Sequence, residues 1–254
     1  MWRPFAAILV IVFCILLLGC WLWAPLNQTV SLRVPIPENN PDLILAGSSG
    51  DIPGRLASGI GVPSSGDTGA WPQFRGAHRD GVATGSPIRE GFPEDGPEVL
   101  WRISVGEGHA GAAIHSGCVY LLDYDEQARE DVVRRLALWN GEDIWRYSYP
   151  VRIKRNHGMS RTVPAVNDEY VVTIGPMGHV HCLKAASGEL VWSKDLTRDY
   201  GTRIPEWYAG QCPLIEPDRV ILAPVGKKYL MTAIDLATEE AIWETPNDLG
   251  WEMT

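Results

Sequence analysis

Leu183-Lys-Ala-Ala-Ser-Gly-Glu-Leu-Val-Trp192 is an apolar run, a tight polar turn and a second apolar run that ends on tryptophan. The same pattern occurs at Leu136-Ala-Leu-Trp-Asn-Gly-Glu-Asp-Ile-Trp145 and at Ile234-Asp-Leu-Ala-Thr-Glu-Glu-Ala-Ile-Trp243, and a weaker copy ends at Leu100-Trp101. The four closing tryptophans lie 44, 47 and 51 residues apart. A period of this length is typical of a repeat architecture in which one small unit is stacked several times.

Each copy is the second half of a repeat that we predict to contain four short strands. The runs are rich in β-branched and aromatic residues, and turn residues separate them. The predicted strands are 162–166, 170–174, 179–183 and 190–193 in the middle repeat, 112–114, 119–122, 132–138 and 143–145 in the preceding one, and 212–215, 219–223, 229–236 and 241–243 in the following one. The leading residues Ala112, Pro164 and Pro213 lie 52 and 49 residues apart, so a second landmark keeps the period.

Four-stranded antiparallel units that repeat in this way are typical of β-propeller blades. The sequence therefore predicts an all-β, incomplete propeller of about three to four blades, because stacking such sheets buries their faces and shortens their edges. Helix is nearly absent from the prediction. The charged insertion at 126–135 is either one or two helical turns or the tip of a long hairpin.

The recurring tryptophans are interpreted as structural. A large apolar ring fills the gap between neighbouring blades, and its burial contributes about 2–3 kcal/mol. Direct contact with a ligand is the alternative interpretation. The residues concerned are Trp101, Trp145, Trp192 and Trp243.

Charge and cysteine usage exclude several functions. The net charge is −9 and the chain has no basic stripe, so a nucleic-acid partner is not expected. The five cysteines form no Cys-x-x-Cys pair and no zinc-type spacing with histidine, so no metal site is predicted. Cys182 and Cys212 fall in predicted strands, where a buried thiol is expected. A disulfide between Cys182 and either Cys118 or Cys212 is the alternative in an oxidising compartment.

The N-terminus carries an export signal. Residues 5–24 are free of charge, follow Arg3, and are long enough to span a bilayer. We predict a single-pass anchor in the cytoplasmic (inner) membrane, with residues 1–4 in the cytoplasm and the propeller on the exported, periplasmic side. Two alternatives stay open: a lipoprotein signal, because Leu17-Leu-Gly-Cys20 resembles a lipobox with Cys20 as the lipidated residue, and a cleaved signal peptide.

Residues 25–70 are rich in Pro, Gly and Ser and are predicted to be a linker, whereas residues 71–254 are predicted to form the partial propeller. At the observed period this second segment holds a little under four repeats. We therefore expect a fragment of a larger ring. Its open ends are expected to be aggregation-prone or to pair with another copy of the chain.

The repeat signature resembles that of the pyrroloquinoline-quinone-like (PQQ-like) β-propeller family, also called quinoprotein alcohol dehydrogenase-like. The clearest copies are Trp139-Asn-Gly-Glu-Asp-Ile-Trp145 and Ala186-Ser-Gly-Glu-Leu-Val-Trp192, while the third copy has Glu239 where glycine is expected. Trp71-Pro-Gln-Phe-Arg-Gly-Ala-His-Arg-Asp-Gly81 resembles the entry motif of exported bacterial propellers of this kind.

This resemblance implies one of two functional classes. One is the quinoprotein dehydrogenases, which bind PQQ and calcium at the centre of the ring and share an adjacent cysteine pair, a central aspartate base and Glu/Asn calcium ligands. The other is non-enzymatic scaffolds, such as the lipoprotein subunit of the outer-membrane protein assembly machine. The chain has no adjacent cysteines. Fold alone does not choose between the two classes.

Polar residues that lead into the first strand of each repeat are the candidate ligand-binding residues. Because these segments face the propeller axis, we expect them to converge at one end of the channel. There, an arginine could pair with a carboxylate and an indole could offer a stacking face. The alternative is a wet channel whose polar side chains satisfy backbone groups. The candidates are Glu107, His109, His157, Arg161, Glu206, Trp207 and Gln211, and no catalytic residue is predicted.

The sequence thus favours a membrane-tethered, exported propeller that binds or scaffolds other envelope proteins, rather than an enzyme. Blade edges and loops are the expected contact surfaces. The alternative is a PQQ-dependent alcohol or sugar dehydrogenase, or a truncated remnant of one.

Overall fold

The computed structural model describes residues 54–65, 69–83, 91–153 and 161–253. The chain divides into two compact units between Pro35 and Ile36, and everything described belongs to the second unit. The predicted anchor at 5–24, the lipidation candidate Cys20 and the site candidate His157 lie outside the described residues. Within the described ranges, no helix is long and apolar enough to cross a bilayer.

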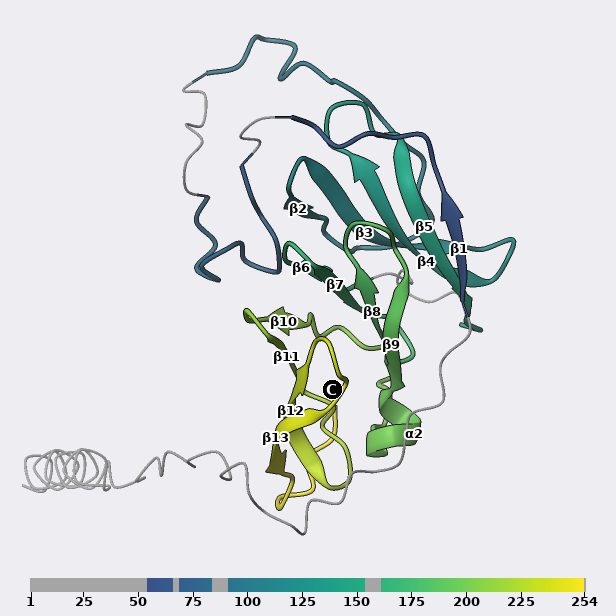
Figure 1. Ribbon diagram of the computed structural model, residues 1–254, viewed down its shortest axis with the longest axis vertical. Coiled ribbons are helices and arrows are strands. Elements are labelled where there is room, and N and C mark those ends of the chain that lie inside the picture. The colour runs from purple at the N-terminus through teal and green to yellow at the C-terminus, as the bar shows by residue number, and fades with distance from the viewer. Residues whose placement is uncertain (1–53, 66–68, 84–90, 154–160, 254) are drawn as a thin grey trace, which may run out of the picture. The chain divides into compact units, whose positions relative to one another are not determined.

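Three antiparallel sheets follow one another along the chain (Figure 1). The first contains β2 (Ala113–His115), β3 (Cys118–Asp125), β4 (Glu130–Ala137) and β5 (Asp143–Pro150), with β1 (Arg55–Ser58) added beside β5. The second contains β6 (Ala165–Val166), β7 (Tyr170–Ile174), β8 (His179–Lys184) and β9 (Leu190–Asp195). The third contains β10 (Leu214–Ile215), β11 (Arg219–Leu222), β12 (Tyr229–Asp235) and β13 (Ala241–Pro246). The predicted all-β class of four-stranded antiparallel units is confirmed.

The charged insertion at 126–135 is a hairpin and not a helix. Strands β3 and β4 pair without a break from Cys118↔Ala137 to Asp125↔Glu130. The carboxylate of Asp125 accepts hydrogen bonds from the backbone N–H groups of Gln127 and Ala128, both at 2.9 Å. Arg129 closes the turn in the left-handed region, with φ of 58°. This side-chain-capped turn lets polar residues end one strand and begin the next.

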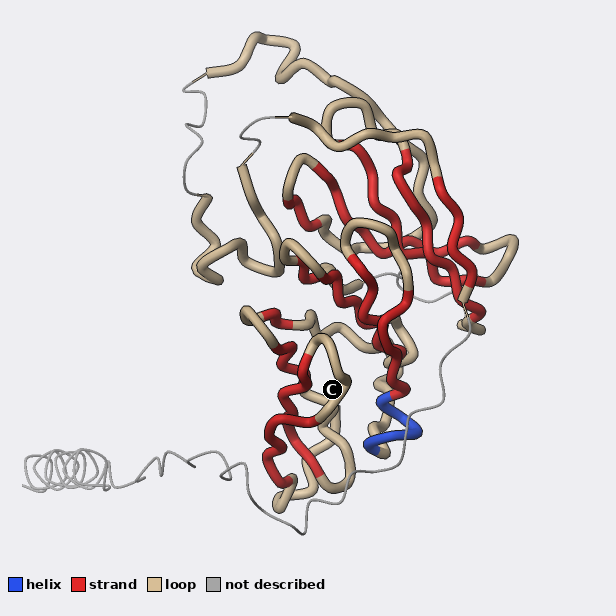
Figure 2. Tube along the Cα trace, in the orientation of Figure 1, coloured by secondary structure: helices blue, strands red, loops and turns tan. Residues whose placement is uncertain are grey.

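Two elements were missed by the sequence analysis. A single helical turn, α2 (Leu196–Tyr200), is the one blue segment in Figure 2. Asp195 caps it by accepting from the N–H groups of Thr197 and Arg198, and Gly201 ends it with φ of 68°. Strand β1 lies inside the segment that was predicted to be a linker, and all four of its residues are exposed. It has no apolar alternation, so periodicity gave no signal for it.

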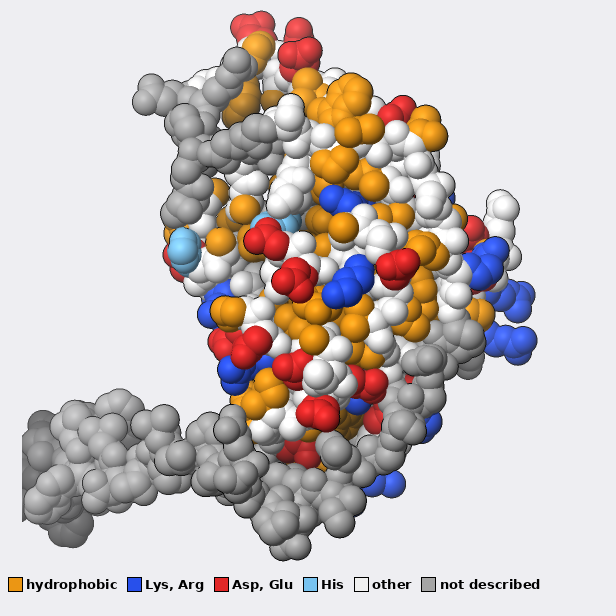
Figure 3. All heavy atoms as spheres, viewed as in Figure 1, with side chains coloured by type: hydrophobic (Ala, Val, Ile, Leu, Met, Phe, Trp, Pro, Cys, Tyr) orange, Lys and Arg blue, Asp and Glu red, His pale blue; other side chains and the backbone are white. Residues whose placement is uncertain are grey.

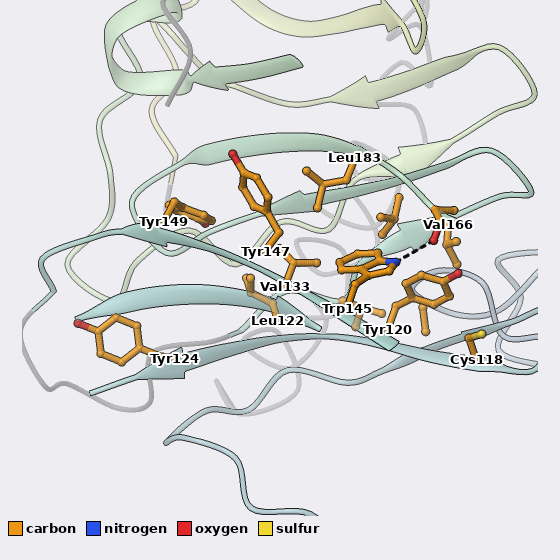
Figure 4. Close-up of a cluster of buried hydrophobic side chains, with 14 of the residues drawn as sticks. Cys118, Tyr120, Leu122, Tyr124, Val133, Trp145, Tyr147, Tyr149, Val166 and Leu183 are labelled. Atoms are coloured by element: carbon orange, nitrogen blue, oxygen red, sulfur yellow. Dashed lines mark hydrogen bonds between the residues drawn. The ribbon is translucent and has the colours of Figure 1, made fainter. Parts of the chain in front are cut away.

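The hydrophobic core consists of two layers, one between each pair of consecutive sheets. The first layer joins Tyr120, Val133 and Trp145 of the first sheet to Val171 and Leu183 of the second (Figure 4). The second layer joins residues of the second sheet to residues of the third sheet and to Leu236, which directly follows β12. The second-sheet residues are Tyr170, Val172, Ile174, Val180, Cys182 and Trp192, and the third-sheet residues are Val220, Leu222 and Ile234. The sheets therefore pack face to face in sequence order.

Three of the recurring tryptophans each reach into the repeat that follows them. The indole Nε1 of Trp145 donates to the carbonyl of Ala185 at 3.1 Å, and that of Trp192 donates to the carbonyl of Leu236 at 2.9 Å. Trp101 makes the same bond to Leu138, at 2.8 Å, from a segment that belongs to no strand. We refer to this bond as the indole–carbonyl contact. Trp145 and Trp192 are each only 2 % exposed, so the contact lies within the core layers.

The acceptor carbonyls occupy one equivalent place in each repeat, directly after the third strand. Three residues further on, the turn adopts positive φ: 74° at Gly141, 78° at Gly188 and 67° at Glu239. A Cβ on Gly188 would lie 2.7 Å from the indole of Trp145, and one on Gly141 would lie 2.6 Å from that of Trp101. Glycine at these turns therefore serves two needs, the left-handed backbone and the close approach of the ring.

Candidate functional site

Segments that lead into the first strand of each sheet surround one cavity of about 480 Å³. Strand β6 contacts both β2 and β10, so these leading segments are neighbours in space. The lining includes three of the predicted candidates, one from each repeat. The lining residues are Phe74, His109, Gly111, Arg161, Val163, Gly210, Gln211, Cys212 and Pro213.

Gln211 is occupied by the backbone. Its side-chain Nε2 donates to the carbonyl of Ala223 at 2.7 Å, and its Oε1 accepts from the N–H of the same residue at 2.9 Å. Ala223 directly follows the end of β11 at Leu222, so the amide of Gln211 replaces a missing ladder partner there. Gln211 therefore acts as the alternative interpretation expects, in which polar side chains of the channel satisfy backbone groups.

The thiol of Cys212 is also part of the scaffold. Its Sγ accepts the N–H of Val163 at 3.2 Å. Burial raises the pKa of the Cys212 thiol above its ordinary value. Cys212 is therefore protonated at neutral pH and is not a ready nucleophile.

His109 and Arg161 are the two remaining cavity candidates. His109 is exposed and Arg161 is half-buried. An imidazole and a guanidinium on one wall can donate hydrogen bonds to a polar or anionic group. Phe74, which is 56 % exposed, supplies an apolar surface in the same lining. The cavity can thus accept a small polar group or a side chain from a partner, and this role stays a prediction.

The other described candidates do not line this cavity. Glu107 is half-buried, whereas Glu206 and Trp207 are exposed, Trp207 to 47 %. Neighbouring Tyr208 has φ of 67°, so this loop turns sharply before it enters the third repeat. The six described candidates therefore divide into a cavity set (His109, Arg161 and Gln211) and a loop set (Glu107, Glu206 and Trp207), which the sequence alone did not separate.

A second cavity, of about 730 Å³, shares Gly210 and Gln211 with the first. Residues 251–253, which follow the last strand, supply part of its wall. Asn247 holds this segment, because its amide donates to the carbonyl of Trp251 at 2.8 Å and accepts the N–H of Trp251 at 2.9 Å. This cavity follows from a loop conformation, for which the sequence gave no periodic signal.

The structure also contains a buried polar cluster that the sequence analysis missed. Tyr149 donates to Oδ2 of Asp131 at 2.7 Å, and its ring lies 4.0 Å from that of His181. The other carboxylate oxygen of Asp131 and both ring nitrogens of His181 have no hydrogen-bond partner among the described residues. Gly175 makes room, since a Cβ there would lie 2.6 Å from Asp131.

Burial dominates the acid–base behaviour of this cluster. It raises the pKa of Asp131 to about 7 and lowers the pKa of His181 to about 3. Both side chains are 0 % exposed, so they cannot reach a substrate. Their place between the first two sheets makes them a determinant of stability rather than of catalysis. The sequence signal for this cluster was the pair His179 and His181, which lie two residues apart on one strand and therefore point to the same face of the sheet.

Metal ligands are not clustered in the described part of the chain. No group of three His, Cys, Asp or Glu side chains there has a metal-binding arrangement. The lining of the first cavity contains no carboxylate. Because Ca²⁺ prefers carboxylate and carbonyl oxygens, these lining side chains do not fit the calcium–quinone centre that the dehydrogenase class implies.

Three antiparallel four-stranded units, joined in series by indole–carbonyl contacts, are the architecture of β-propeller blades. Residues 128–250 match the PQQ-type family model that is described as outer membrane protein assembly factor BamB. This match agrees with the resemblance of the repeat signature to the PQQ-like β-propeller repeat family. A comparison with curated protein sequences found no match.

Two similar solved structures bear on the fold, and one of them reaches a TM-score of 0.50. Quinohemoprotein alcohol dehydrogenase from Comamonas testosteroni is 19 % identical with a TM-score of 0.50, over 70 % of this chain and 27 % of that one. BamB from Moraxella catarrhalis is 16 % identical with a TM-score of 0.40, over 58 % of this chain and 43 % of that one. The chain thus spans less than half the length of these proteins. The Comamonas likeness shows the fold alone.

Proposed function

We propose that this protein is a binding or scaffolding module for other proteins of the bacterial cell envelope. The match of residues 128–250 to the BamB family carries this proposal, because that family is named for its part in outer membrane protein assembly. In this proposal residues 5–24 anchor the chain in the inner membrane and the blades stand on the exported side.

The site geometry supports a binding role. Gln211 and Cys212 are used by the backbone, and His109 and Arg161 line the same cavity, where their N–H groups suit polar groups of a partner. Outside the cavity lining, the loop before β10 exposes Trp207. An exposed indole is a typical centre of a protein-binding surface, since tryptophan is enriched in interface hot spots.

The test is recovery of envelope partners with the full chain. Tagged protein is cross-linked in membranes of the source bacterium, and the proteins recovered with wild type, Trp207→Ala and the matched control Val82→Ala are compared. Val82 is 56 % exposed and lies far along the chain from the loop. We expect Trp207→Ala to reduce the specific partners about tenfold or more and Val82→Ala to leave them unchanged. Equal recovery with both variants would exclude this surface.

A PQQ-dependent oxidoreductase is the second candidate, favoured by the fold likeness to the Comamonas dehydrogenase. The cavity lining does not supply calcium ligands, so this candidate has less support. Incubation of the full chain with PQQ and calcium, followed by absorbance and dye-linked oxidation of alcohols and sugars, tests it. Absence of binding at high micromolar PQQ removes the enzyme candidate.

A further inference from the structure

The outer face of the third sheet repeats the face with which the first two sheets bind their neighbours. Cross-strand partners share one face of a sheet, so their side chains form a row. In the third sheet the row is Leu214, Ile221, Ala233 and Trp243. The equivalent rows are Ala113, Tyr120, Arg135 and Trp145 in the first sheet and Ala165, Val172, Cys182 and Trp192 in the second.

The next sheet covers this row in the first two cases. Trp145 and Trp192 are each 2 % exposed and Val172 is fully buried. In the third sheet, by contrast, Ile221 and Trp243 are only half-buried. The opposite face of the third sheet is the one that packs on the second sheet, through Val220 and Ile234. The partly exposed row is thus the continuation of an interface that the chain forms twice.

Trp243 also lacks the bond that its equivalents make. Trp101, Trp145 and Trp192 each donate from Nε1 to a carbonyl of the next repeat. Among the described residues none accepts a hydrogen bond from Nε1 of Trp243. The expected occupant is therefore a blade that offers a carbonyl directly after its third strand, with a left-handed turn residue three positions later.

The first sheet of this chain carries such an acceptor carbonyl, and the tryptophan that binds it does not belong to a sheet. Its carbonyl at Leu138 and its turn at Gly141 receive Trp101, which comes from an irregular segment instead of a sheet. Around Trp101, Leu100 is 74 % exposed and Val99 is 56 % exposed. The segment is held to the first sheet again at Ser104, whose carbonyl accepts from Arg134 at 3.3 Å, and at Gly106, which donates to Asp123 at 2.7 Å.

We propose that the third sheet of one copy docks on the first sheet of a second copy, with Trp243 replacing Trp101 at the Leu138 carbonyl. The exchange keeps one indole–carbonyl contact and additionally buries the row around Ile221. The two surfaces differ, so the contact is head-to-tail, and it closes into a ring or extends as a chain of copies. This proposal does not depend on the proposed binding of envelope proteins.

Sedimentation of the full chain in detergent solution over a range of concentrations tests the proposal. Trp243→Ala and Ile221→Glu should weaken self-association about tenfold or more, because both remove the apolar row. Leu249→Ala is the matched control, since Leu249 is 72 % exposed outside the row and its truncation should change nothing. A wild-type chain that stays monomeric at all concentrations overturns the proposal.

Trp101→Ala identifies the acceptor. This variant vacates the Leu138 carbonyl and should tighten self-association about threefold or more, since a second copy no longer has to displace Trp101 from it. Trp101→Phe keeps the ring and removes the N–H, so it should act in the same direction with a smaller effect, and it replaces the alanine variant if thermal unfolding shows that the latter is misfolded. Weaker or unchanged association in these variants overturns docking on the first sheet, even if Trp243→Ala dissociates the copies.

Discussion

Asp131 and His181 are ionisable side chains that the fold buries in one cluster between the first and second sheets. Their effects on stability have opposite signs. The pKa of Asp131 is raised to about 7, so the folded state binds its proton more tightly than the unfolded state does, and stability falls as pH rises from about 4 to about 7. The pKa of His181 is lowered to about 3, so stability falls as pH drops from about 6.5 to about 3.

Replacement of Asp131 by asparagine should therefore stabilise the protein at alkaline pH. Asparagine keeps an acceptor for the Tyr149 hydroxyl and carries no charge. Denaturant unfolding at pH 8 should show a gain on the order of 2–4 kcal/mol for Asp131→Asn, and no comparable gain at pH 4. A variant that is less stable than wild type at pH 8 would show that the carboxylate is compensated in the fold.

Replacement of His181 by leucine tests the opposite slope. Leucine can pack against the Tyr149 ring and cannot be protonated, so His181→Leu should lose less stability than wild type between pH 6 and pH 4. The measurement is the free energy of unfolding at each pH. The same acid sensitivity in both proteins would contradict the burial of a neutral imidazole.

At the scale of the element, the turn after the third strand decides how well each blade receives its neighbour. Two repeats have glycine at the left-handed position, and the third has Glu239, whose carboxylate pairs with Lys194 at 2.8 Å. A non-glycine residue in this conformation costs about 1–2 kcal/mol, whereas a partly exposed ion pair returns at most about 1 kcal/mol. Glu239 is thus a departure from the repeat that its ion pair only partly offsets.

Substitutions at the equivalent turns should accordingly differ in sign. Gly188→Ala should destabilise the protein by about 1–3 kcal/mol, because it adds left-handed strain and a Cβ 2.7 Å from the Trp145 ring. Glu239→Gly should be neutral or stabilising by up to about 1 kcal/mol, since it relieves strain and loses only the ion pair. Melting temperatures of the two variants check this, and a large loss for Glu239→Gly would mean that the Lys194 pair dominates.

The elements also show where sequence reasoning succeeded. The predicted strand 170–174 has the observed bounds. Its five residues are all buried, and each is either β-branched or aromatic. The exposed strand β1 and the single turn α2 escaped, since one depends on pairing with β5 and the other on a cap at Asp195. Apolar periodicity identifies elements that bury one face. Strand β1 is fully exposed and α2 buries only Leu196, so neither element produces such a pattern.

At the scale of the whole molecule, the period of the tryptophans predicted the order of the sheets but not the chemistry between them. The leading segments meet at one cavity, as their positions indicated, yet only His109, Arg161 and Gln211 line it. Glu107, Glu206 and Trp207 do not line it, and the loop that carries Glu206 and Trp207 turns at Tyr208, which has positive φ. Loop conformations of this kind depend on tertiary contacts and leave no repeat in the sequence.

The indole–carbonyl contact is the feature on which the blade order, the role of the turns and the proposed self-association all depend. Hydrogen exchange at the indole Nε1 protons, assigned with single Trp→Phe variants, measures it directly in dilute protein. We predict that the Nε1 protons of Trp145 and Trp192 exchange far more slowly than that of Trp243. Rapid exchange at Trp145, or protection of Trp243 equal to that of Trp192 in the monomer, would contradict it.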